Sequence, residues 1–392
     1  MLRFVVFFWA VLSGVAMFIG QPDLSAEDTL STEETLTAEE TLSTEVRNLV
    51  EIAIQEKKLP GAVVMIGIGD RTVLHEAYGS REVEPAKVAM TIDTVFDLAS
   101  LTKPIATASS VMALIEREEI GLRDPVASHL PEFAVNGKDA VTVEQLLLHT
   151  GGLIPDNPMS DYRGSEQESI ERLMKLSLNY PPGTRFRYSD VGFEVLGEWV
   201  RRVSGEDLHA FSQRHVFVPL GMTETTFRPE SRLRQRAAPT QKRGGDWMRG
   251  EVHDPRAFAL GGIAGHAGLF STSADLAVFA RMILGDGTLD EVSIFKPETI
   301  RIMNRAYPVP GGIRGLGWDK QTGYSSNRGR TMTASALGHG GFTGTALWID
   351  PELQLYVIFL SNRVHPSGDG SVNRLAGAIG TLAADFAAAH EP

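Results

Sequence analysis

Cysteine is absent from all 392 positions of the sequence. Its absence excludes disulfides, thiolate nucleophiles and cysteine-ligated zinc.

Positive charge is also scarce, because 37 Lys and Arg stand against 49 Asp and Glu and leave a net charge of −12. Nucleic acids attract basic surfaces, so a chain with this balance has no electrostatic basis for binding them. We therefore expect no nucleic-acid partner.

Two sequence patterns are also missing, and each argues against a class of enzyme. The Gly-x-Ser-x-Gly motif of the α/β-hydrolases does not occur. Gly67-Ile-Gly69 lacks the third glycine and the following helix of a dinucleotide-binding site. The sequence contains 43% hydrophobic and 22% charged residues, a composition typical of a soluble globular protein. The length fits one large domain or two ordinary ones.

An apolar segment follows Arg3 and runs from Phe4 to Gly20. It has the length and composition of a signal peptide or of a short N-terminal membrane anchor. Leu24-Ser25-Ala26 ends in the small residue typical of a cleavage site, but Leu24 stands where a second small residue is usual. We therefore predict export to a periplasmic or extracytoplasmic location. Residues 1–26 would be the signal peptide or anchor, and residues 4–20 would tether an uncleaved chain to the membrane.

An acidic, Thr-rich pattern repeats through residues 27–45. The copies are Thr29-Leu-Ser-Thr-Glu-Glu34, Thr35-Leu-Thr-Ala-Glu-Glu40 and Thr41-Leu-Ser-Thr-Glu45. They contain few large apolar side chains, so they cannot bury enough surface to offset the entropy of ordering. We predict a disordered linker between the export segment and the folded body.

The body, residues 46–392, has strand patterns at both ends and helical patterns between them. β-rich segments at 62–69 and 73–78 predict a hairpin, and two more lie at 345–349 and 355–360. An Ala-rich helix is expected at 371–389. We predict an α+β fold with a central antiparallel sheet, flanked by terminal helices, and an all-helical insertion at about residues 122–270.

Ser100 and Lys103 lie within the octapeptide Asp97-Leu-Ala-Ser-Leu-Thr-Lys-Pro104. Residues three apart share one face of a helix, so the lysine amine can lie beside the serine hydroxyl and activate it without a histidine. Pro104 is tolerated in a first helical turn, whose N–H groups lack intrahelical partners, so we expect Ser100 to open a helix. The pair alone also fits an ordinary helix start with an exposed lysine.

Two later motifs complete a family pattern. Tyr188-Ser-Asp190 lies in a break between helices, and His339-Gly-Gly341 lies at the start of a late strand. With Ser100-x-x-Lys103 they resemble, in order and spacing, the serine penicillin-recognising family of class C β-lactamases, DD-peptidases and related esterases. That family shows Ser-x-x-Lys, Tyr-x-Asn, and Lys-Thr-Gly or His-x-Gly. The resemblance covers roughly residues 46–388 and includes segments 143–153, 219–222 and 268–272. Segment 252–270 is most similar to a bacterial subgroup of muropeptide amidases and DD-carboxypeptidase-like proteins.

The resemblance implies the catalytic roles. Ser100 would attack a carbonyl and form an acyl-enzyme, and Lys103 and Tyr188 would share the role of base. The backbone N–H groups of Ser100 and Phe342 would form the oxyanion hole. No cofactor and no metal are implied.

The substrate-binding positions that the resemblance implies are Asp190, His339, Gly340 and Gly341, and two of them depart from the family pattern. The glycines would let the late strand approach the substrate closely. Asp190 replaces Asn, and an ionised carboxylate cannot donate to a substrate carbonyl and favours a charged lysine, so we expect weak β-lactam turnover. His339 replaces Lys and is mostly uncharged at neutral pH, which favours substrates without a terminal carboxylate.

For the other ionisable residues that could belong to a site, we expect structural roles. His253, Asp254 and His266 invite a metal site, but they lack His-x-x-x-His spacing and lie in a Gly-rich loop. His149 is expected at a helix end, where it can hydrogen-bond to the backbone. Glu166 is expected at an exposed helix start and not as a deacylation base.

These observations predict an exported serine hydrolase acting on amide or ester bonds, with peptidoglycan-derived peptides as the first candidate substrate. A small-ester esterase or a weak β-lactamase is the alternative within the enzyme class. The alternative outside it is a penicillin-binding sensor of the cell wall that is acylated but does not turn over. Its sequence would look nearly the same.

Overall fold

The computed structural model describes residues 26–117 and 120–390. The predicted tether at residues 4–20, and all but the last residue of the predicted signal peptide or anchor, lie outside these ranges. Of the helices within the ranges, none is both long enough and apolar enough to cross a membrane. The described fold begins with α1 (Ala26–Gln55).

In the described part of the chain, the largest unit is an antiparallel sheet of nine strands. Their order is β10-β11-β12-β13-β14-β15-β1-β2-β3, so strands from the two ends of the body lie side by side. The strands are β1 (Gly61–Ile68), β2 (Arg71–Glu82), β3 (Val88–Ala89), β10 (Tyr307–Val309), β11 (Gly312–Arg314), β12 (Asp319–Gln321), β13 (Leu337–Gly341), β14 (Thr345–Asp350) and β15 (Leu355–Ser361). The predicted hairpin and late strands are confirmed as β1–β2 and β14–β15. The sequence pattern did not indicate β10–β12.

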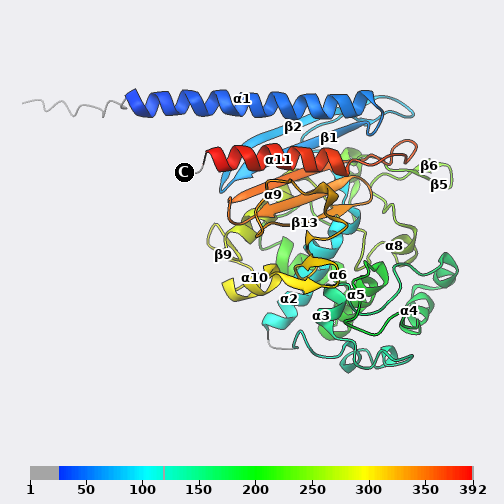
Figure 1. Cartoon of the computed structure of the whole chain (residues 1–392). Helices are drawn as coiled ribbons and strands as arrows, with labels where there is room; N and C mark the ends of the chain where they lie inside the picture. The colour runs from blue at the N-terminus through cyan, green and yellow to red at the C-terminus, as the bar shows by residue number, and fades with distance from the viewer. Residues whose placement is uncertain (1–25, 118–119, 391–392) are drawn as a thin grey trace, which may run out of the picture.

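Two terminal helices cover one face of the sheet (Figure 1). α1 contacts both α11 (Asn373–Ala389) and the β1–β2 hairpin. Its buried residues Leu42, Val46 and Val50 are spaced by four, so one side of the helix faces the sheet over this part of α1. The predicted antiparallel sheet with flanking terminal helices is thus confirmed.

The prediction of a disordered linker at residues 27–45 is wrong, because α1 runs through it. Leu42 belongs to the Thr-rich repeat and is 4% exposed, and Ala38 packs against the same core. Glu39 forms an ion pair with Arg71 of β2, and Ser43 Oγ donates a hydrogen bond to Glu76 at 2.6 Å. The physical reason is register: the repeat places Ala38 and Leu42 in line with the apolar stripe of the body, so the helix extends back over the sheet.

The opposite face of the sheet is covered by α9 (Ser273–Leu284), which packs on β1, β14 and β15. Below it lies the helical lobe (Figure 1), which is not all-helical as predicted, because β5 (Lys242–Arg243) pairs with β6 (Asp246–Trp247) within it. The other α-helices are α2 (Ser109–Glu116), α3 (Val143–Leu147), α4 (Glu166–Met174), α5 (Asp190–Ser204), α6 (Leu208–Ser212), α7 (Ser231–Arg236), α8 (Pro255–Ala259) and α10 (Pro297–Asn304). Helices on both faces explain why β1 is buried along nearly its whole length.

The chain enters and leaves the lobe at one place. β4 (Phe96–Asp97) pairs with β7 (Phe270–Ser271), on either side of the lobe in sequence. Hydrogen bonds from the sheet side also hold the segment after β4. The Thr343 hydroxyl donates to the backbone oxygen of Asp97 at 2.7 Å, and the Thr345 hydroxyl donates to that of Leu98 at 3.0 Å. Ser100 follows directly. The contact between sheet and lobe therefore positions the candidate nucleophile.

Candidate active site

Ser100 lies in a strained turn. It belongs to the 3₁₀ turn η1 (Ala99–Leu101), which is followed by a π-helix, η2 (Lys103–Ala108), and then by α2. Ala99 has a φ of 46°, in the left-handed region that residues with a Cβ rarely adopt. Asp97 holds this turn, because its carboxylate accepts from the N–H of Ala99 at 2.8 Å and from that of His253 at 2.6 Å. The helix expected to start at Ser100 is therefore present, but its first turns are a 3₁₀ turn and a π-helix before α2 begins.

The ammonium of Lys103 is surrounded by three oxygens. Its Nζ lies 3.0 Å from Ser100 Oγ, 3.1 Å from the backbone oxygen of His266 and 2.6 Å from Asp190 Oδ1. The first two contacts are hydrogen bonds, and the third is an ion pair. The side chain is fully buried. In this arrangement Lys103 donates to Ser100, so it must lose a proton before it can act as a base.

Tyr188 is held beside this pair by His149. The backbone N–H of Ser189 donates to His149 Nδ1 at 3.1 Å, and the rings of His149 and Tyr188 lie 4.5 Å apart. Lys103 Nζ is 4.9 Å from the centre of the Tyr188 ring, and the tyrosine hydroxyl interacts with both Ser100 and Lys103. The three predicted catalytic residues therefore meet in one place. His149 indeed lies just past a helix end, after α3, but its contact with Tyr188 was not predicted.

The charges of this cluster favour a protonated lysine. Burial alone would lower the pKa of Lys103, but the charges and hydrogen bonds of Asp190 and Tyr188 together outweigh it and raise the pKa. Burial alone would raise the pKa of Asp190, and the charges of Lys103 and His266 outweigh it and lower the pKa. Asp190 is also the first residue of α5, where the helix dipole stabilises an anion. Burial raises the pKa of Tyr188, so the phenol holds its proton tightly.

Close approach of β13 to the Ser100 turn requires Gly341. A Cβ on Gly341 would lie 2.4 Å from the backbone oxygen of Leu98 and 2.2 Å from Thr345 Oγ1. Phe342 comes next and lines the same cavity as Ser100. A glycine is thus needed for the strand end to lie against the turn that carries the candidate nucleophile.

His339 is buried on β13, and its Nδ1 lies 2.8 Å from the backbone oxygen of Gly340. Burial, together with the charges of Arg314 and Lys103, holds the pKa of His339 well below its usual range. It is therefore uncharged at neutral pH, as expected from its residue type.

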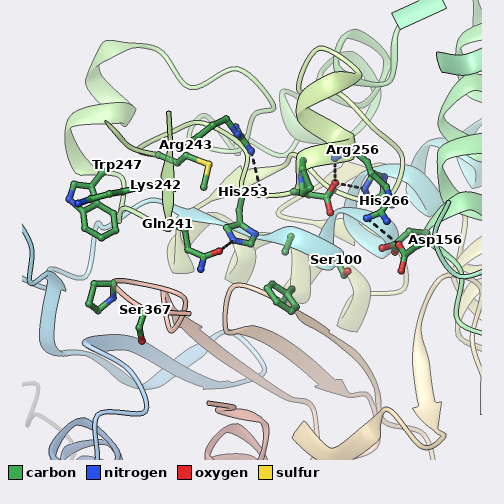
Figure 2. A pocket seen from close by; sticks show the side chains of 18 of the residues that line it. Ser100, Asp156, Gln241, Lys242, Arg243, Trp247, His253, Arg256, His266 and Ser367 are labelled. Carbon is green, nitrogen blue, oxygen red and sulfur yellow. Dashed lines mark hydrogen bonds and ion pairs between the residues drawn. The ribbon is translucent and has the colours of Figure 1, made fainter. Parts of the chain in front are cut away.

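Two cavities meet at Tyr188 and Phe342, beside the candidate nucleophile. The larger, of about 980 Å³, contains Ser100 and Asp190 and extends to Trp247 and Ser367 (Figure 2). The smaller, of about 260 Å³, is lined by His339, Gly340, Gly341, Arg314 and Arg363. Tyr188 and Phe342 line both. A substrate whose scissile bond lies at Ser100 can therefore place one part in each cavity.

Arg314 is the residue of this site that the sequence analysis missed. It lies at the end of β11, its side chain is 0% exposed, and it lines the smaller cavity. Its Nη1 is 3.5 Å from Asp319 Oδ1, yet in the described part of the chain no nitrogen of the guanidinium has a hydrogen-bond partner. A buried group with unused donors is costly unless a ligand completes it. No sequence pattern pointed to Arg314, because the strands that carry it were not predicted.

His253 and His266 both line the larger cavity, with separate partners (Figure 2). His253 Nε2 lies 2.7 Å from Gln241 Oε1, and its ring stacks on that of Phe342. His266 lies between carboxylates and is described below. Over residues 26–117 and 120–390, no group of three or more His, Cys, Asp or Glu could hold a metal ion. Glu166 is exposed in the first turn of α4 and lines neither of these cavities.

An α+β fold with a buried lysine beside a serine, and a tyrosine next to both, defines a serine hydrolase related to β-lactamases and DD-peptidases. The chain belongs to the beta-lactamase family, which matches residues 45–381.

Curated relatives agree with this assignment. The chain is 30% identical over 345 residues to the "N-acetylmuramyl-L-alanine amidase" of Bacillus subtilis (strain 168), covering 78% of each chain. It is 29% identical over 352 residues to the "Putative D-alanyl-D-alanine carboxypeptidase" of Escherichia coli (strain K12), covering 80% of this chain and 81% of that one. Among solved structures, "EstCE1, a hydrolase with promiscuous acyltransferase activity" has the same fold, with a TM-score of 0.73 and 24% identity over 89% of this chain and 100% of that one.

Proposed function

We propose that the protein hydrolyses an amide bond in a cell-wall-derived peptide, outside the cytoplasm, through an acyl-enzyme on Ser100. The names of its curated relatives, an amidase and a carboxypeptidase, support amide chemistry on cell-wall material. The expected export of the chain places it where such peptides occur. The structural observation that supports a peptide substrate is the buried guanidinium of Arg314, in the cavity next to Ser100.

Catalysis would start with attack of Ser100 Oγ on the substrate carbonyl. Its proton would pass to the Lys103–Tyr188 pair, once Lys103 has given up a proton of its own. The oxyanion would accept hydrogen bonds from the backbone N–H groups of Ser100 and Phe342. The pair would then return the proton to the leaving amine. Water would attack the ester of Ser100 in a second step and release the acid.

Arg314 would bind a carboxylate of the substrate. A guanidinium presents a planar set of N–H donors that matches a carboxylate, and those of Arg314 are unused. Arg363 lines the same cavity and adds positive charge there. The uncharged His339 led us to expect substrates without a terminal carboxylate, but a different residue supplies the cation. We therefore propose a substrate with a free carboxylate on the leaving-group side.

The test compares two peptides ending in D-alanyl-D-alanine, one with a free carboxylate and one with a C-terminal amide. Wild type should cleave the free acid with a kcat/KM at least about tenfold higher, because a hydrogen bond to a charged group contributes about 1.5–3 kcal/mol. Arg314→Gln should remove this preference, and Ser100→Ala should abolish cleavage of both. Arg330→Gln, on an exposed arginine, is the matched control. Preference for the amide in wild type would contradict the proposal.

A second candidate function is a binding protein that is acylated but does not turn over. The observation that favours it is the Lys103–Asp190 ion pair, because a lysine held in its charged form is a poor base for deacylation. Product release in excess of one equivalent per enzyme separates the two functions. One equivalent followed by no further product would indicate the sensor.

A further inference from the structure

His266 has a carboxylate at each of its ring nitrogens. Its Nε2 lies 3.0 Å from Asp254 Oδ1, and its Nδ1 lies 3.3 Å from Glu194 Oε1. The ring itself is 1% exposed. A neutral imidazole has only one N–H, so it can serve only one of the two carboxylates as a donor. Both carboxylates attract positive charge on the ring, so the arrangement favours the imidazolium: Nε2 donates to Asp254, and the Nδ1 side forms an ion pair with Glu194 without a hydrogen bond.

Both carboxylates are fixed in place by other contacts. Asp254 is the N-cap of α8, and its Oδ1 accepts from the N–H groups of Arg256 and Ala257, each at 2.8 Å. Glu194 is buried on α5 and accepts from the Tyr162 hydroxyl at 2.6 Å. The imidazolium is thus held in a preformed anionic site. This explains why burial, which alone would lower the pKa of His266, is outweighed by the charges of Glu194 and Asp254, which raise it to about 9.

The same residue touches the catalytic lysine. The backbone oxygen of His266 accepts from Lys103 Nζ at 3.1 Å, and both His266 and Asp190 line the large cavity. The charges of His266 and Asp190 affect one another, as the lowered pKa of Asp190 shows. The ionisable and charged groups around His266 are Glu194 and Asp190 on α5, Asp254 before α8, Tyr162, Lys103, Asp156 and Arg256.

We propose that His266 is a positioning residue for Lys103. Its carbonyl fixes the ammonium, and its imidazolium, held by Asp254 and Glu194, offsets the extra negative charge that Asp190 brings to the site. Asp190 favours the protonated lysine, which cannot take a proton from Ser100. A second cation nearby favours loss of that proton, so His266 restores part of the neutral, proton-accepting form of Lys103 that Asp190 removes. The proposal rests on the proposed function only in that Ser100 is the nucleophile.

The test is the rate at which a fluorophosphonate probe labels Ser100, measured from about pH 6 to 10 in wild type and His266→Gln. This readout does not depend on the natural substrate, so a wrong peptide assignment leaves it intact. Labelling retained in Ser100→Ala would instead overturn the nucleophile assignment. We expect His266→Gln to label about tenfold more slowly at pH 7, which corresponds to a rise of about one unit in the pKa of Lys103.

The pH dependence separates a charge effect from structural damage. Above about pH 9 wild-type His266 loses its own proton, so the two rates should converge there. Damage to the fold would slow labelling by the same factor at every pH, and that result would overturn the proposal. His209→Gln, on a half-buried histidine of α6 outside both cavities, is the matched control and should follow wild type throughout.

Glu194→Gln provides a second variant if His266→Gln does not fold. It keeps the imidazole and its packing but removes one carboxylate, so His266 should lose its proton at a lower pH. Labelling should then equal wild type at about pH 6 and be slower at about pH 8. Equal slowing at both pH values would again overturn the proposal.

Discussion

Lys103 Nζ lies 2.6 Å from Asp190 Oδ1, and the lysine has no contact with solvent. The carboxylate stands where the Tyr-x-Asn motif has an amide, and as an anion it serves as a counter-ion of the lysine. The pair explains two properties of the site together. It stabilises a buried ammonium, and it keeps that ammonium from acting as a base.

Asp190→Asn should increase the rate of penicillin hydrolysis at pH 7 by about tenfold or more, since each unit of pKa changes the fraction of neutral lysine tenfold. In wild type the charge of Asp190 raises the pKa of Lys103 against the effect of burial. Without that charge, burial lowers the pKa, so the rate should also begin to rise at a lower pH. Steady-state hydrolysis from pH 5 to 10 checks both effects. Asp70→Asn, in the exposed turn between β1 and β2, is the control. Unchanged turnover would show that Asp190 does not limit the base.

Gly341→Ala should lower kcat about 100-fold or more, comparable to the loss of one oxyanion-hole donor. The new Cβ would lie 2.4 Å from the backbone oxygen of Leu98, so the end of β13 must move away from the Ser100 turn. Steady-state kinetics with a p-nitrophenyl ester measures the loss. Gly323→Ala meets no atom within 4 Å and should retain wild-type activity. Equal activity of the two variants would contradict the close approach of β13.

The pH dependence of stability should report the His266 imidazolium. The pKa of His266 in the folded protein, about 9, exceeds the value of about 6.5 for an unfolded histidine. Its contribution to stability is therefore fully present below about pH 6.5 and is lost as pH rises through about 9. The free energy of unfolding should fall by up to about 1.4 kcal/mol per pH unit in this window.

Urea unfolding at pH 6.5, 7.5 and 9 measures this slope. His266→Gln should lack it, whereas His209→Gln should keep it. An equal slope in wild type and His266→Gln would mean that His266 is neutral in the folded protein.

Leu42→Ala should lower the free energy of unfolding by about 2 kcal/mol or more, as expected for deleting a buried leucine side chain. Leu42 is 4% exposed, between α1 and the core of the sheet. Thr41→Ala, on the exposed side of the same helix, should change it by less than about 0.5 kcal/mol. Urea denaturation of both variants measures the difference. Equal effects would indicate that α1 does not pack as described.

Local patterns in the sequence determined much of this protein. The β-rich composition of β1 and β2 and the spacing of Ser100 and Lys103 depend on neighbouring residues, so they could be read from the chain. The order of strands and helices was sufficient for the fold class. The disordered linker was predicted wrongly because composition does not reveal a register that continues a buried stripe at Leu42.

Only the tertiary structure decided which charged side chains lie next to one another. Lys103, Asp190 and His266 are far apart in sequence, and whether a carboxylate at 190 reaches the lysine depends on how α5 packs on η2. The same holds for Arg314, which lies beside Tyr188 only because β11 joins the sheet near β13. Burial and Coulomb energy depend on distances through space and not on spacing along the chain. The sequence thus indicated the candidate nucleophile, and the fold determined the electrostatic environment around it.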